Sequence, residues 1–171
     1  MKRADALRPV DDAARDQARA LLIAARHGAL AVIEPGSGHP AASRVALVAD
    51  DDGGLIILVS TLAAHTAALQ ADPRCSVLIG EPGAGDPLAH PRLSVQGAAD
   101  RLARDSTQGV AARERFLAAH PRAALYADFG DFGFWRIALQ RISLNAGFGR
   151  AHEMSADDLR PFRAAGDPIR P

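Results

Sequence analysis

Residues 41–60, "AASRVALVADDDGGLIILVS", decide the fold, because they hold two strand patterns joined by a turn. In the first pattern Ser43, Val45 and Leu47 share one face of an extended strand, since successive side chains of a strand point to opposite faces. The acidic and glycine-rich run at 50–54 is typical of a tight hairpin turn. The stretch therefore predicts two adjacent antiparallel strands.

The second pattern, "LIILVS" at 55–60, is apolar on both faces, which is typical of a central strand in a closed sheet. The helical pattern after it is predicted to end at Asp72, because a residue before proline disfavours the α conformation. Strands joined to short helices in this way favour a small barrel of the α+β class.

Further elements are predicted on both sides of this unit. A helix over about 12–27 is indicated by apolar residues such as Ala14 and Leu22 at helical spacing, with Gly28 as a stop signal. The other expected elements are strands at 29–34, 74–81 and 92–102, a helix over about 107–119 with Val110, Phe116 and Leu117 as core candidates, one or two strands within 134–147, and a short helix starting at Ser155.

Composition limits the class of protein. With 171 residues, 48% of them hydrophobic, we expect one domain over 1–171, with its barrel at about 29–147 and a C-terminal loop and helix at 148–171. The 20 basic residues balance the 20 acidic ones, so charge favours neither nucleic acid nor an anionic membrane as a partner. No apolar leader or membrane-length run occurs, and we expect a cytoplasmic protein. The single Cys75 lies in an apolar run, which predicts a buried, unreactive thiol.

The motifs of several common site types are absent. The 6 histidines show neither the i, i+4 spacing nor the cysteine partners of zinc sites. The sequence also lacks the serine hydrolase elbow G-x-S-x-G, the dinucleotide-binding G-x-G-x-x-G after a strand, and the Walker phosphate loop. It therefore predicts no metal site and no ordinary nucleotide-binding fold.

The junction "LVSTLAAHTAAL" at 58–69 is the strongest candidate site. A helix N-terminus with hydroxyl side chains nearby is suited to an anion, because its N–H groups and dipole favour negative charge. Counting back from the hairpin turn places Arg44 near Ser60, where a cation would strengthen the site. The alternative is purely structural: Thr61 caps the helix and His65 is a solvated helix residue.

Four segments, taken in order, resemble the pyridoxamine 5′-phosphate oxidase-like FMN-binding split β-barrels. Within that family they are most similar to the haem-utilisation branch. The resemblance covers about residues 20–160 and implies a mainly antiparallel split β-barrel of α+β class that binds FMN. The segments are "RVALV" (44–48), "LIILVSTLAAHTAALQADPRCSVLIGE" (55–81), "PRLSVQGAADRL" (91–102) and "NAGFGRAHEMSADDL" (145–159).

The resemblance implies that the FMN phosphate is held by the second strand, the end of the third strand and the start of the next helix. The family's arginine-lysine pair on that helix is replaced here by His65 and Thr66, which removes two charges from the phosphate site. The implied contacts are Ser43, Arg44, Val59, Ser60, Thr61, His65 and Thr66.

The resemblance also implies a homodimer with flavin sites between the subunits. The backbone of Val45 and Ala46 would face the polar edge of the flavin ring. Arg92 would reach the flavin of the other subunit, where a fixed cation stabilises reduced flavin. The alternative for Arg92 is a charge at a strand edge.

Two positions bear on the substrate. Val48 occupies the place of the lysine that holds the vitamin's phosphate in the oxidases, which disfavours vitamin oxidation. "GFGRAHEMSADDL" at 147–159 is similar to the haem branch, with His152 as a candidate haem ligand or a hydrogen-bonded structural residue. We therefore predict an FMN-dependent oxidoreductase that acts on a small-molecule substrate. The alternatives are a haem-binding or haem-degrading protein and a barrel without catalysis; no catalytic acid or base is predicted.

Overall fold

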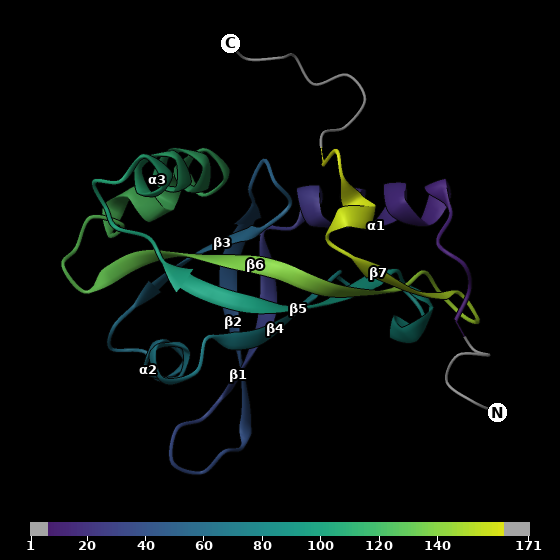
Figure 1. The fold of residues 1–171 in the computed structure, drawn as a ribbon, viewed down its shortest axis with the longest axis horizontal. Helices are drawn as coiled ribbons and strands as arrows, with labels where there is room; N and C mark the ends of the chain where they lie inside the picture. Colours follow the sequence, from purple (N-terminus) through teal and green to yellow (C-terminus); the bar gives the residue numbers. More distant parts are fainter. Residues whose placement is uncertain (1–6, 163–171) are drawn as a thin grey trace.

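The computed structural model describes residues 7–162. Its strands form a 7-stranded antiparallel sheet in the order β3-β2-β1-β4-β5-β6-β7, and a further pairing of β3 with β6 closes the sheet into a barrel that leaves β7 outside (Figure 1). This confirms the predicted α+β split-barrel class. The strands are β1 His27–Ile33, β2 Pro40–Ala49, β3 Leu55–Ser60, β4 Arg74–Ile79, β5 Arg92–Arg101, β6 Phe132–Asn145 and β7 Ala151–Ser155.

Short helices lie outside the barrel. In Figure 1, α3 and α1 lie far apart along the long axis of the molecule, and α2 lies at the same end as α3 with strands of the sheet between them. Ser106 caps α3 by accepting a hydrogen bond from the N–H of Gly109 at 3.0 Å. The α-helices are α1 Asp12–Ala24, α2 Ala64–Ala71 and α3 Thr107–Ala119, and the 3-10 helices are η2 Pro87–Ala89, η3 Pro121–Leu125 and η4 Asp157–Leu159.

The hairpin and the central strand form as predicted. The N–H of Asp50 donates to the carbonyl of Gly54 at 2.8 Å, and Gly53 takes a φ of 85° that suits glycine. Both faces of β3 are buried: Ile57 belongs to the core inside the barrel, whereas Ile56 belongs to a second apolar cluster with Phe116 of α3. β3 therefore separates two cores, which explains its unbroken apolar sequence.

Two predicted helix features are wrong. The helix predicted over 12–27 ends at Ala24, because His27 is already in β1, where it pairs with Ala46 of β2. Val110, predicted in the core, is 46% exposed on α3, although Phe116 of the same helix is fully buried. Tertiary pairing overrides local helix preference in the first case.

The C-terminal part also differs from the prediction. Residues Ala151–Ser155 form β7, which pairs with β6, and the helix predicted from Ser155 is a single 3-10 turn. The carboxylate of Asp158 accepts hydrogen bonds from the N–H and hydroxyl of Ser155, at 2.8 and 2.9 Å, and closes this turn. The end of the predicted C-terminal segment, 163–171, lies outside the described residues.

Cys75 is buried as predicted, and burial raises the pKa of its thiol to about 11. The thiolate that reacts is therefore disfavoured. None of the helices within residues 7–162 has the length and apolar character needed to cross a membrane.

Candidate functional site

β2 and β3 separate at the end where the polar residues gather. Their ladder runs only from Ala49↔Leu55 to Leu47↔Ile57, although β2 continues back to Pro40. Beyond Leu47, β2 pairs with β1 alone, and the end of β3 pairs with β6. The backbone edge of β2 that faces away from β1 is therefore unpaired within the described sheet, and it offers N–H and C=O groups to a ligand.

His65 of α2 connects this open part of β2 to the following helix. Its Nδ1 lies 3.0 Å from the hydroxyl oxygen of Ser43, within hydrogen-bond distance. Its Nε2 is buried and has no hydrogen-bond partner among the described residues. Burial lowers the pKa of His65 from its ordinary value of 6.5, so the ring is held neutral near pH 7. A buried ring nitrogen without a hydrogen-bond partner is uncommon in folded proteins.

The start of α2 is uncapped. The N-cap residue is Ala63, which makes no side-chain hydrogen bond to the helix, so the alternative in which Thr61 caps α2 is wrong. Within the described residues, the N–H groups of Ala64 and His65 have no acceptor. Two free N–H groups at a helix N-terminus suit an anionic oxygen.

The hydroxyls predicted beside this helix are partly in use. Ser60 donates its proton to the carboxylate of Asp131 at 2.5 Å, and Thr66, which is buried, donates to the carbonyl of Ser60 at 2.6 Å. The hydroxyl of exposed Thr61 has no partner among the described residues. Asp131 was not predicted as a site residue, because nothing near it in the sequence connects it to Ser60.

Arg44 does not join Ser43 and His65. Arg44 was expected near Ser60, but the β2–β3 ladder ends at Leu47↔Ile57, and Ser60 pairs with Phe132 of β6 instead. Ser43 points toward His65, and successive side chains of a strand point to opposite faces, so Arg44 points away from them. Arg44 is exposed and has no ion-pair or hydrogen-bond partner within residues 7–162.

Four other predicted residues have different environments. Val45 and Val59 are core residues, exposed by 5% and 4%, so only their backbones are open to a ligand. Ala46 is half-buried on the opposite face of β2 from Val45. Arg92, at the start of β5, donates to the carbonyls of Leu88 and His90 at 3.0 and 3.2 Å. β1 and β4 lie between β5 and β2 in the sheet, so Arg92 does not join His65 in the same chain.

His152 is 7% exposed, on β7, where it pairs with Leu144. Its Nδ1 donates to the carbonyl of Pro9 at 3.0 Å. A planar macrocycle needs an accessible ring nitrogen, so this burial favours the structural alternative for His152 over haem ligation. Among the residues described, no three His, Cys, Asp or Glu side chains are grouped as a metal would require.

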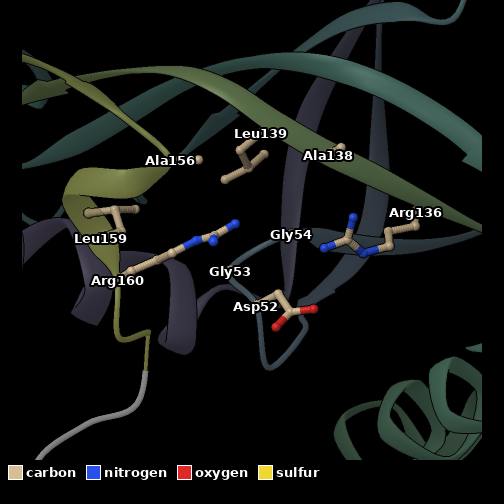
Figure 2. A pocket seen from close by; sticks show the side chains of 9 residues that line it. All are labelled: Asp52, Gly53, Gly54, Arg136, Ala138, Leu139, Ala156, Leu159 and Arg160. Carbon is tan, nitrogen blue, oxygen red and sulfur yellow. The ribbon is translucent and has the colours of Figure 1, made fainter.

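A small cavity lies at the other end of β3. It has a volume of about 100 Å³ and includes none of the predicted site residues. Figure 2 shows the guanidinium groups of Arg136 and Arg160 facing each other across Gly53 and Gly54. Arg136 is paired with Asp50 at 2.5 Å and Arg160 with Asp157 at 3.6 Å. Because each cation already faces a carboxylate, this cavity has little excess positive charge for an anion.

Comparison with known proteins agrees with this fold. Residues 14–146 match the family model described as pyridoxamine 5′-phosphate oxidase. The chain is 35% identical to the non-canonical haem oxygenase HOZ, chloroplastic, of Arabidopsis thaliana over 136 residues, which are 77% of this chain and 40% of that protein.

Solved structures are similar in the same region. A haem-binding protein from Mycobacterium smegmatis has a TM-score of 0.79 and 32% identity, over 88% of this chain and 61% of that one. The protein Atu2129 of Agrobacterium tumefaciens, of unknown function, has a TM-score of 0.77 and 30% identity, over 90% of this chain and 63% of that one. HutZ of Vibrio cholerae, at 20% identity over 77% of this chain and 93% of that one, shares the fold with a TM-score of 0.66. The chain thus spans less than two thirds of the Arabidopsis, Mycobacterium and Agrobacterium proteins.

Proposed function

The chain belongs to the pyridoxamine 5′-phosphate oxidase family, and from this premise we propose that it binds FMN at the N-terminus of α2 and acts as a flavin-dependent oxidoreductase. The observation that carries the proposal is the buried Nε2 of His65, which has no partner among the described residues. A phosphate oxygen would supply the missing partner.

The phosphate would be held by neutral donors. The N–H groups of Ala64 and His65, the hydroxyl of Thr61 and, in the appropriate tautomer, the Nε2–H of His65 are available for it. Hydrogen bonds to a charged oxygen are stronger than neutral ones, and these donors would hold the phosphate in place of an arginine or lysine. The open edge of β2 at Val45 and Ala46 would receive the polar edge of the ring.

When bound, FMN would supply hydride or electron transfer at its flavin ring. The chain's own residues would bind the phosphate, orient the ring along β2 and leave its other face to a small-molecule substrate. Val48, in place of the family's lysine, is buried against Phe116 of α3 and cannot hold a substrate phosphate. We therefore propose a substrate other than the phosphorylated vitamin.

We further propose a homodimer in which Arg92 of each subunit approaches the flavin of the other. Arg92 lies away from His65 within one chain. Within the described residues, only Nη1 of its guanidinium donates, to the carbonyls of Leu88 and His90, so its other nitrogens are free to donate to a ligand. A second copy would have to bring this cation to the ring, where it would favour the reduced, anionic flavin. A monomeric, flavin-bound protein in solution would contradict this part of the proposal.

Haem binding is the second candidate, because the Arabidopsis and Mycobacterium relatives are a haem oxygenase and a haem-binding protein by name. The anion donors of α2 suit a propionate as well as a phosphate. His152 does not suit the iron, since its ring is buried. A third possibility, a barrel without flavin or catalysis, is favoured by the absence of a fixed cation on the Ser43 face of β2 within the described residues.

The test is a set of equilibrium titrations of the purified full chain with FMN, riboflavin and haemin. FMN should bind more tightly than riboflavin, which lacks the phosphate, and His65→Leu should weaken FMN about tenfold while His65→Gln retains a donor and weakens it less. His39→Gln, in an exposed turn, is the control. The proposal is wrong if the wild-type chain binds no FMN, and a Soret band with haemin alone would favour the second candidate.

A further inference from the structure

Asp131, in the loop before β6, is joined to the end of β3 by two hydrogen bonds. Its carboxylate accepts the proton of Ser60 at 2.5 Å, and its carbonyl accepts the N–H of Thr61 at 2.8 Å. The hydroxyl oxygen of Ser60 also accepts the N–H of Leu62 at 3.1 Å. Because a hydroxyl has a single proton, Ser60 has none left for an anion at α2.

The carboxylate of Asp131 forms no ion pair within the described residues, although the guanidinium of Arg104 donates nearby to the carbonyls of Phe129 and Phe132. The Asp131 side chain is half-buried. By contrast Asp128, three residues earlier, accepts two hydrogen bonds from Arg113 at 2.9 and 2.6 Å. A partly desolvated, unpaired carboxylate repels a second negative charge more strongly than an exposed one does.

We propose that Asp131 is a specificity-determining residue that limits the affinity of this site for a phosphate dianion. The inference rests on the proposed function, since it concerns the same site at the start of α2. Asp131 acts in two ways: it adds a like charge beside Thr61, and it holds the proton that Ser60 would otherwise donate. Both effects weaken FMN, whereas riboflavin, which lacks the phosphate, is affected little.

The experiment compares FMN and riboflavin dissociation constants for the wild type, Asp131→Asn and Asp128→Asn. The amide introduced by Asp131→Asn keeps an oxygen that accepts from Ser60 but carries no charge. The ratio of FMN to riboflavin affinity should rise about three- to tenfold in Asp131→Asn and stay within about twofold in Asp128→Asn. If Asp131→Asn does not fold, Asp131→Ala should give the same direction.

A double-mutant cycle with Ser60→Ala separates the two effects. In the wild-type background Ser60→Ala should not remove a hydrogen bond to the phosphate, because the Ser60 proton is already held by Asp131. In the Asp131→Asn background the same change should remove part of the gain, because the neutral amide holds the Ser60 proton less strongly and Ser60 can then donate to the phosphate. Equal effects in both backgrounds would show that Ser60 is not released and would overturn that part of the inference.

Failure of this inference is distinguishable from failure of the proposed function. An unchanged affinity ratio in Asp131→Asn, with FMN still bound by the wild type, overturns the inference alone. If the wild type binds no FMN, the proposed function fails, and inorganic phosphate becomes the probe, followed by the NMR signals of the His65 ring. Asp131→Asn should then bind phosphate more tightly than the wild type, and equal binding would overturn the inference.

Discussion

The hydroxyl of Ser43 and the Nδ1 of His65 lie 3.0 Å apart and join the unpaired part of β2 to the start of α2. The two residues are separated by 22 positions in the sequence. Their contact fixes the orientation of the imidazole ring and places its other nitrogen, Nε2, where it has no partner within the described chain.

Ser43→Ala is expected to lower both stability and FMN affinity. Removing the hydroxyl leaves Nδ1 of His65 without its partner, which costs about 1 kcal/mol of unfolding free energy, and it frees the ring to turn away from the ligand. Urea denaturation and FMN titration measure the two effects. Ser94→Ala on β5 is the control, because Ser94 is exposed. If Ser43→Ala leaves the FMN affinity unchanged, the orientation of the His65 ring does not contribute to FMN binding.

His65 is expected to make stability depend on pH. Burial lowers its pKa below 6.5 in the folded chain, so the unfolded chain takes up a proton first as the pH falls. The contribution of His65 to the free energy of unfolding is therefore fully present when the pH is above its ordinary pKa of 6.5. It is lost as the pH falls from that value through the lower pKa of the folded chain. The free energy of unfolding, measured between about pH 8 and pH 5, should fall less in His65→Gln than in the wild type.

A bound phosphate is expected to raise the pKa of His65, which burial lowers, because an anion next to Nε2 favours the protonated ring. The pKa of His65, followed by NMR of its ring, should rise when FMN or inorganic phosphate is added. An unchanged titration curve in the presence of bound ligand would place the phosphate away from His65.

Much of the barrel could be predicted from the sequence, because its determinants are local. The hairpin at 50–54 and the unbroken apolar run of β3 are short patterns that need no knowledge of distant residues. β7 was missed because its five residues, Ala151–Ser155, are stabilised mainly by pairing with β6, and the capping pattern at Ser155 outweighed them. Helix α1 was predicted too long for the same reason, since His27 is extended by its pairing with β2.

The site was predicted less completely, because its contacts are distant in the sequence. The junction at 58–69 identified His65 and Ser60, but Asp131 lies 71 positions from Ser60. Strand alternation alone places Ser43 and Arg44 on opposite faces of β2, as expected from the sequence. Only the contact between Ser43 and His65 shows that Ser43, and not Arg44, faces the start of α2.

Val48→Lys is expected to destabilise the protein rather than create a substrate site. Val48 is 7% exposed and lies in the cluster with Phe116 beneath α3, so an unpaired ammonium there would cost about 2–4 kcal/mol. Val110→Lys on α3 is the control, because Val110 is 46% exposed and should change stability by less than about 0.5 kcal/mol. Thermal or urea denaturation measures both. Equal effects of the two changes would show that Val48 is more accessible than its burial indicates.

His152→Ala is expected to lower stability without changing haem binding. Its ring is 7% exposed on β7, and its Nδ1 donates to the carbonyl of Pro9, so the change removes a packed ring and a hydrogen bond, at a cost of about 2 kcal/mol. If the protein binds haemin, the Soret band should keep its position in His152→Ala and in the exposed control His39→Ala. Loss or displacement of the band in His152→Ala alone would identify His152 as the iron ligand and would require β7 to move, because the His152 ring is buried.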